Sequence, residues 1–145
     1  MRNKIVLVYK DVEGEIAEET VWAKPVGNNY KIDNIPFYAP NLALNDIISV
    51  ENDDGTLYFD DLVKPSGHST IQIIFFKETE IKRVLKNIEK MGCKWEGMEN
   101  KPYFSVDIPP SIEYGQVRSI LDIEFNNKNL DFKEACLSEK HIINK

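Results

Sequence analysis

The chain has 145 residues, of which 42% are hydrophobic and 29% are charged, as is typical of a soluble globular protein of one domain or two small ones. It has no apolar run of about 18 residues to span a membrane, and the apolar stretch near the amino terminus is too short for a secretory signal. We therefore expect a cytoplasmic protein without a membrane partner.

The negative charge is concentrated in the first half of the chain. Residues 1–64 hold 6 Lys/Arg and 12 Asp/Glu, whereas residues 65–145 hold 12 of each, so the first half accounts for the formal net charge of −6. An acidic surface repels phosphate backbones and attracts basic surfaces. We therefore expect a basic protein partner and no nucleic acid, unless the acidic residues serve only to keep the surface solvated.

Short strands and frequent turns are predicted along residues 1–64. Lys4–Lys10 is rich in β-formers, and a hairpin is expected around the turn at Gly27–Asn29. Pro36 and Pro40 then bracket an irregular crossover. A second hairpin is predicted over Asp46–Phe59, where NDDG supplies the turn. This pattern is typical of a small barrel or a strongly bent sheet.

The hydrophobic period changes after the turn at Pro65–Ser69. The run STIQIIFF predicts a buried strand, and apolar residues at spacings of three and four predict a helix over Glu80–Gly92, with Thr79 as a possible N-cap. Two strands follow, in CKWEGME and PYFSVDI. Ser111 is expected to cap a second helix, and LDFKEACL is a last strand.

The predicted fold class is α+β, with a small amino-terminal β-barrel-like sheet in residues 1–64 and a ferredoxin-like βαββαβ unit in residues 65–145. The second unit is expected to bury one common core, made of Ile73, Phe75, Ile81, Leu85, Val106, Val117, Leu121 and Phe132.

The segment from Trp22 to Ile71 resembles a bacterial family known as domain of unknown function 4265. The matching features are the tryptophan of the first hairpin, the NIPFYA crossover, the NDII strand and the SGHST turn. The family name carries no activity, so the resemblance implies no catalytic residue. In size, charge and architecture the chain is also similar to immunity proteins that neutralise toxins, which is an analogy and not a shared motif.

A possible site lies at the junction of the two halves, around Ser66, His68 and Ser69. An imidazole there could act as an acid, a base or a pH-sensitive contact, although a structural role is the simpler interpretation. A functional His68 would need an orienting carboxylate, for which the candidates across the hairpin are Asp46, Asp60 and Asp61. No GxSxG nucleophile motif occurs. His141 is expected to be solvated in a polar tail.

The acidic hairpin and two aromatic side chains form the predicted partner-binding set: Glu51, Asp53, Asp54, Asp60, Asp61, Trp22 and Tyr38. The carboxylates lack the spacing of a calcium-binding loop. Cys93 and Cys136 lie in predicted strands without a CxxC motif, so buried thiols are expected and neither a metal nor a cofactor is predicted.

The leading hypothesis is a non-enzymatic protein-binding module that docks a basic partner, in the most concrete form a toxin neutralised by its immunity protein. The alternative is a small-molecule-binding protein or small enzyme with its site around His68, which requires an accessible imidazole beside a carboxylate. An RNA-binding regulator would require a basic open face on the second sheet. The sequence makes no prediction of the oligomeric state.

Overall fold

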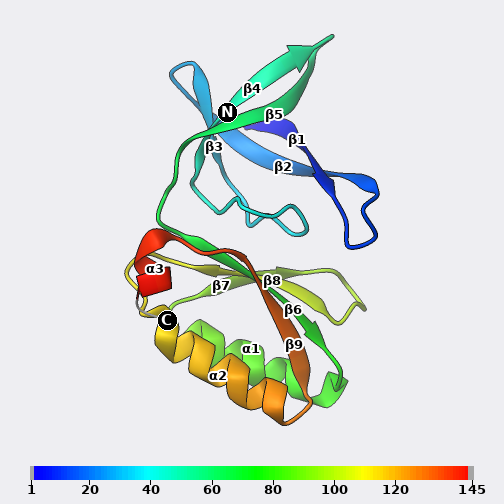
Figure 1. Cartoon of the computed structure of the whole chain (residues 1–145), viewed down its shortest axis with the longest axis vertical. Helices are drawn as coiled ribbons and strands as arrows, with labels where there is room; N and C mark the ends of the chain where they lie inside the picture. Colours follow the sequence, from blue (N-terminus) through cyan, green and yellow to red (C-terminus); the bar gives the residue numbers. More distant parts are fainter. Residues whose placement is uncertain (1, 144–145) are drawn as a thin grey trace.

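The computed structural model describes residues 2–143 as a mixed α+β fold of two sheets and three α-helices. One sheet lies above the other in Figure 1, and the helices lie beside the lower sheet. The five strands of the first sheet are β1 (Asn3–Lys10), β2 (Ile16–Val26), β3 (Asn29–Ile32), β4 (Ile47–Asp53) and β5 (Thr56–Lys64).

The first sheet is a succession of antiparallel neighbours in chain order. A parallel bridge between Val6 and Tyr58 then joins β1 to β5, so that the strand order closes on itself. The turn between β4 and β5 contains Asp54 and Gly55 at φ values of 53° and 91°, the conformation that a two-residue hairpin turn requires. The predicted hairpin is confirmed, and its second strand continues to Lys64.

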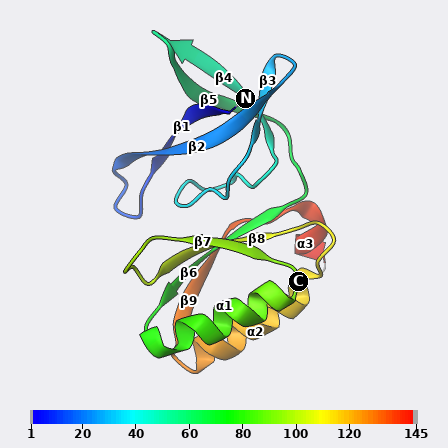
Figure 2. The same ribbon diagram turned by 180° about the vertical axis from the view of Figure 1, so that it is seen from behind.

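The second half contains β6 (Ser69–Phe75), a 3-10 turn (Glu78–Glu80), α1 (Ile81–Lys90), β7 (Lys94–Gly97), β8 (Tyr103–Ile108), α2 (Tyr114–Asn126), β9 (Leu130–Cys136) and α3 (Glu139–Ile143). The sheet order is β7-β8-β6-β9, and every neighbouring pair is antiparallel. Helices α1 and α2 cover one face of this sheet, as Figure 2 shows from behind. The predicted order of strands and helices is therefore present, with the unpredicted α3 added at the end.

The predicted N-caps were wrong by one residue for α1 and by two for α2. The N-cap of α1 is Glu80 and that of α2 is Glu113, and neither makes a side-chain cap hydrogen bond, so Thr79 and Ser111 are not the caps. A 3-10 turn precedes α1, and a turn closed by the Ile112 N–H and the Pro109 carbonyl, 3.1 Å apart, precedes α2. Because these turns come first, each α-helix begins later in the chain than predicted.

Each half has its own hydrophobic cluster. In the second half, six of the eight predicted core residues are buried, and Ile81 and Phe132 are half-buried against them. A separate cluster that includes Ile5, Leu7, Ile32 and Ile48 fills the first sheet. Two clusters fit the predicted division at residue 64, which stays a prediction.

The crossover at residues 33–46 lies between the two sheets, and polar side chains of the second sheet hold it there. Ser105 Oγ donates to the Pro36 carbonyl at 2.6 Å, and Thr70 Oγ1 donates to the Leu42 carbonyl at 3.0 Å. Buried carbonyls need such donors because they have lost water. The crossover therefore lies against the face of the second sheet that α1 and α2 leave free.

Neither cysteine forms a disulfide. Cys136 ends β9, as predicted, but Cys93 lies in the turn between α1 and β7 and not in a strand. Burial raises the pKa of Cys93 to about 12 and that of Cys136 to about 11, so both thiols are protonated at neutral pH. Within residues 2–143 there is no helix both long and apolar enough to span a membrane.

Candidate functional site

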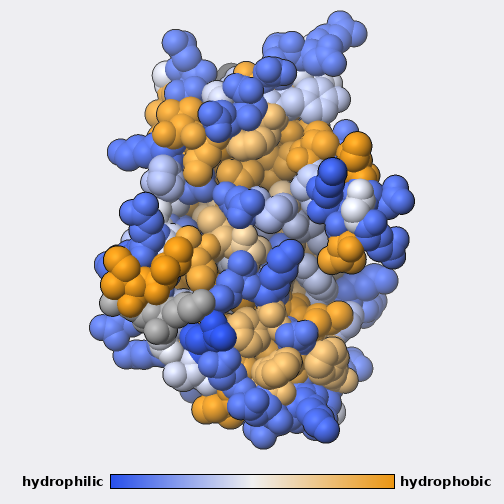
Figure 3. All heavy atoms as spheres, viewed as in Figure 1, coloured by the Kyte–Doolittle hydropathy of each residue, from blue (hydrophilic) through white to orange (hydrophobic). Residues whose placement is uncertain are grey.

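The predicted acidic set lies on the hairpin β4–β5, which projects from the top of the molecule in Figure 1 and ends in hydrophilic side chains in Figure 3. Glu51, Asp53, Asp54, Asp60 and Asp61 are all exposed. Asp60 accepts a hydrogen bond from Ser49 Oγ at 3.0 Å, and Asp61 accepts one from the Leu62 N–H at 2.9 Å. The ion pairs found within residues 2–143 include none of these five carboxylates.

The two predicted aromatic contacts lie in other parts of the molecule. Trp22, on β2, has the Arg2 guanidinium 4.8 Å and the Lys4 ammonium 5.3 Å from its ring, so it belongs to a cationic cluster. Tyr38 lies in the crossover, where its ring centroid is 5.4 Å from that of Tyr103. The structure therefore places the five carboxylates on one hairpin but distributes the seven predicted residues over three places.

Two other carboxylates of the first half, those of Glu19 and Asp46, have internal partners. Glu19 accepts hydrogen bonds from the backbone N–H groups of Phe37, Tyr38 and Ala39 at 2.5, 2.8 and 2.9 Å, and so fixes one end of the crossover. The buried Asp46 accepts from the N–H groups of Ala43 and Ser66 at 3.0 and 2.8 Å. No local sequence signal marks Glu19 for this role, because its partners lie 18 to 20 positions away.

His68 lines a cavity of about 460 Å³ at the junction of the two halves, together with Asp46, Ser66, Ser138 and Lys140. Its side chain is 15% exposed, and its Nδ1 lies 2.9 Å from Asp107 Oδ1. Its Nε2 lies 3.4 Å from the side-chain amide of Asn45. The imidazole thus has both a carboxylate partner and a position in a cavity wall.

The orienting carboxylate of His68 is Asp107, so the prediction of Asp46, Asp60 or Asp61 was wrong. Asp60 and Asp61 lie on the hairpin, and Asp46 is engaged by backbone N–H groups. Asp107 is on β8, where strand pairing places it beside Thr70. Burial raises the pKa of Asp107, and the hydrogen bond from His68 opposes this rise.

The two serines of the junction have structural partners. Ser66 Oγ donates to the Leu44 carbonyl at 2.7 Å and accepts from the His68 N–H at 3.1 Å. Ser69 is fully buried, and its Oγ accepts from the Ser138 N–H at 2.8 Å while it lies 2.5 Å from His141 Nδ1. A buried hydroxyl cannot reach a substrate, so the Ser69 and His141 pair does not form a nucleophilic site.

The expectation that His141 is solvated was wrong, since its relative exposure is 1%. Its Nε2 lies 3.1 Å from the carbonyl oxygens of both Pro109 and Ile112, which identifies this nitrogen as the N–H donor. Burial lowers the pKa of His141, and so favours a neutral ring that accepts from Ser69 at Nδ1. His141 therefore anchors the short helix α3 against the rest of the second half.

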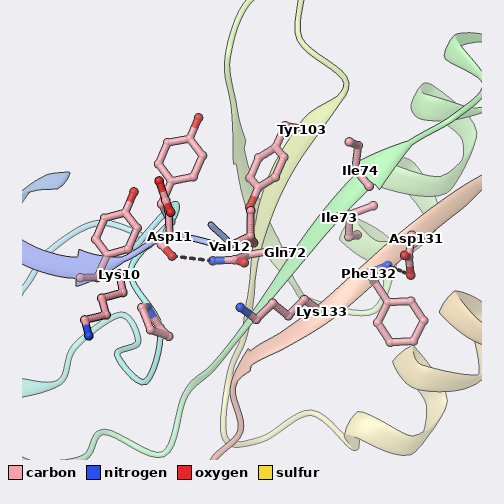
Figure 4. Close-up of a pocket in the computed structure, with 13 residues that line it drawn as sticks. Lys10, Asp11, Val12, Gln72, Ile73, Ile74, Tyr103, Asp131, Phe132 and Lys133 are labelled. Atoms are coloured by element: carbon pink, nitrogen blue, oxygen red, sulfur yellow. Dashed lines mark hydrogen bonds between the residues drawn. The ribbon is translucent and has the colours of Figure 1, made fainter. Parts of the chain in front are cut away.

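A second cavity, of about 430 Å³, was not predicted (Figure 4). Tyr103, Gln72 and Lys133 come from the adjacent strands β8, β6 and β9, and Asp11 and Val12 come from the connection between β1 and β2. Tyr9, Lys10, Tyr38 and Pro40 complete the first-half side of the wall. The polar positions of β6 and β8 could have marked this face, but the sequence could not show which segment lies over it.

Among the described residues, 2–143, no three His, Cys, Asp or Glu side chains gather in an arrangement that could hold a metal ion.

Comparison with known protein families matches residues 19–131 to a family described as domain of unknown function (DUF4265). A solved structure described as a novel crystal structure of a hypothetical protein from Neisseria gonorrhoeae is 37% identical in sequence and has a TM-score of 0.85. The match covers 95% of this chain and 96% of that one. A comparison with curated proteins found no match.

Proposed function

We propose that this chain, which belongs to the DUF4265 family, is a non-enzymatic binding module that docks a basic protein partner through the acidic hairpin β4–β5. In its most concrete form the proposal is that the protein is an immunity protein and that the partner is a toxin.

The contrast between two groups of carboxylates in the same half carries the proposal. Glu19, Asp33 and Asp46 are held by backbone N–H groups or by basic side chains. The hairpin carboxylates are exposed and are absent from the ion pairs of residues 2–143. Exposed carboxylates without internal cationic partners attract a cationic surface.

The exposed position of these charges indicates what they would contribute to binding. Charges at the rim of an interface mainly raise the association rate and the specificity, and their effect falls as the salt concentration rises. Trp22 and Tyr38, each 39% exposed, are the aromatic candidates for the contact, but the cationic neighbours of Trp22 make it a separate contact point.

Affinity purification of the tagged chain from its host tests the proposal. Wild type is compared with a variant in which Asp53, Asp54, Asp60 and Asp61 are changed to Asn. The control changes Glu18, Glu78, Glu99 and Glu113 to Gln, which alters the net charge by the same amount on exposed positions elsewhere. We expect a stoichiometric basic partner with wild type and the control but not with the hairpin variant. Equal recovery with all three proteins, or no partner with any, would refute the proposal.

The second candidate function is binding or conversion of a small molecule at the His68 junction. The pair of His68 and the buried Asp107, 2.9 Å apart in the wall of a cavity, favours it, because a carboxylate fixes the tautomer and orientation of an imidazole. The side-chain amide of Asn45 lies 3.4 Å from His68 Nε2, so a ligand that binds this nitrogen would have to displace the amide or bridge to it.

A screen of small metabolites by thermal unfolding tests the second candidate. A ligand of this site should stabilise wild type and stabilise the His68→Asn variant much less, while Lys86→Gln, an exposed change on helix α1, should behave as wild type. Equal stabilisation of wild type and His68→Asn would exclude a role for the imidazole.

We also infer that the first sheet is a small barrel and that the second half is a ferredoxin-like unit. The bridge from β1 to β5 supports the first inference, and the order β7-β8-β6-β9 with two helices on one face supports the second. The cytoplasmic location stays a prediction, which fractionation of cells that express the tagged chain would test.

A further inference from the structure

The tyrosine-lined cavity of Figure 4 has the size and position of a small-molecule site. Its volume of about 430 Å³ lies within the range of known ligand pockets, which often form where two structural units meet. Its walls come from the first sheet, the crossover and the second sheet. The site is separate from the acidic hairpin and from the His68 junction.

Aromatic and apolar side chains gather at this cavity. The ring centroids of Phe37 and Tyr38 lie 4.8 Å apart, and those of Phe37 and Tyr103 lie 5.0 Å apart, which makes a continuous aromatic cluster beside the cavity. The lining residues Val12 and Ile74 are 95% and 41% exposed. Exposed apolar surface around a concavity is where a flat ring would displace water favourably.

Fixed polar groups accompany the apolar ones. The side-chain amide of the buried Gln72 donates to the carbonyls of Phe37 and Tyr38 at 3.2 and 3.3 Å, so its orientation is set before any ligand arrives. Burial raises the pKa of Tyr9 and Tyr38, and raises that of Tyr103 to about 12. The three phenols are therefore neutral at physiological pH and keep their O–H donors, of which that of Tyr38 points to Met98 Sδ at 3.7 Å.

The charged groups of the lining differ in their partners. Asp11 Oδ1 accepts from the N–H groups of Glu13 and Glu15, both at 2.9 Å, and Asp131 Oδ1 accepts from the Phe132 N–H at 2.8 Å. The ion pairs of residues 2–143 contain neither Lys10 nor Lys133. Lys133 stands beside Gln72 in the strand ladder, and its side chain extends along the cavity in Figure 4.

We propose that this cavity binds a small aromatic carboxylate, with its ring against Tyr38 and Tyr103 and its carboxylate against the Lys133 ammonium. Gln72 and the phenol O–H groups would hydrogen-bond the remaining polar atoms. The aromatic wall selects the ring, and the unpaired amine selects the negative charge.

Titrations of the full ¹⁵N-labelled chain, followed by amide chemical shifts, test this assignment with three probes. The probes are 4-hydroxybenzoate, its uncharged analogue 4-hydroxybenzamide, and cyclohexanecarboxylate, which keeps the charge but lacks the aromatic ring. We expect saturable shifts at residues 10–12, 72–74 and 131–133 with 4-hydroxybenzoate below about 10 mM, and binding about tenfold weaker for each of the other probes.

Two exposed lysine variants isolate the role of the amine. Lys133→Gln should weaken 4-hydroxybenzoate about tenfold and leave 4-hydroxybenzamide unchanged, whereas Lys86→Gln on α1 should change neither. No saturable shift at the named residues would overturn the site. Equal affinity for the acid and the amide, or an unchanged affinity in Lys133→Gln, would overturn the assignment of a carboxylate ligand.

Discussion

The hairpin β4–β5 and the crossover at residues 33–46 are neighbours in the sequence, yet they are stabilised in opposite ways. The hairpin forms through its own turn and strand ladder, and its carboxylates face solvent. The crossover has no regular structure of its own, so its backbone groups depend on Glu19, Asp46, Thr70 and Ser105. Carboxylates in the hairpin are therefore available for a partner, whereas Glu19 and Asp46 are required by the fold.

Of the variants that test this comparison, Asp46→Ala should lose the most stability. The variant leaves the N–H groups of Ala43 and Ser66 without acceptors, and we expect the free energy of unfolding to fall by about 3 kcal/mol. Urea denaturation followed by circular dichroism measures the loss. Asp61→Ala, on an exposed position, is the control, and equal losses in the two variants would remove the distinction between the two groups of carboxylates.

Glu19→Ala should have the next largest effect, about 2 kcal/mol, because three backbone N–H groups of the half-buried crossover lose one acceptor side chain. Hydrogen exchange of the Phe37, Tyr38 and Ala39 amides should also become faster. The neighbouring exposed Glu18→Ala is the matched control. Unchanged exchange at these three amides would show that the crossover is held from the second sheet alone.

The stability of the folded protein should depend on pH through the buried His141. Burial lowers the pKa of His141 by more than the hydrogen bonds to the Pro109 and Ile112 carbonyls raise it, and nearby Lys140 and His68 act in the same direction as burial. The unfolded chain therefore binds a proton more readily, so the stabilising contribution is complete above about pH 6.5 and is lost as the pH falls.

Urea denaturation at about pH 7.5 and about pH 5.5 measures this loss of stability. His141→Gln should be less stable than wild type at the higher pH and should lose less stability on acidification. An identical loss in both proteins would assign the pH dependence to groups other than His141.

The smallest effect on stability is expected for the hairpin variant with Asn at positions 53, 54, 60 and 61. Exposed substitutions of this kind usually change stability by no more than about 0.5 kcal/mol, and relief of repulsion should make the sign favourable. Thermal unfolding of wild type and variant at low and high salt measures this change in stability. A loss of several degrees would mean that these carboxylates stabilise the sheet, and would weaken the case for a docking role.

Local chemistry in the sequence was sufficient for the hairpins, for helix α1 and for the order of the second half. Asp54 and Gly55 fix a turn through their own backbone conformations, and the stripe of Val84, Leu85 and Ile88 fixes a helical face. These signals act between residues that are close in the chain, so they can be identified without a structure. The acidic hairpin belongs to this class.

Only the tertiary structure decided which distant groups meet. It placed Asp107 against His68 across 39 positions, Ser69 against His141 across 72, and the crossover over the polar side of β6 and β8. Strand pairing and the burial of polar groups determine these contacts. A pattern of neighbouring residues in the sequence predicts neither of them. The charge and the order of the strands are therefore properties of the sequence. The tertiary structure decided the two cavities, the neutral state of His141 and the structural use of Glu19 and Asp46. Folding removes these polar groups from water, and each must then find a partner within the protein.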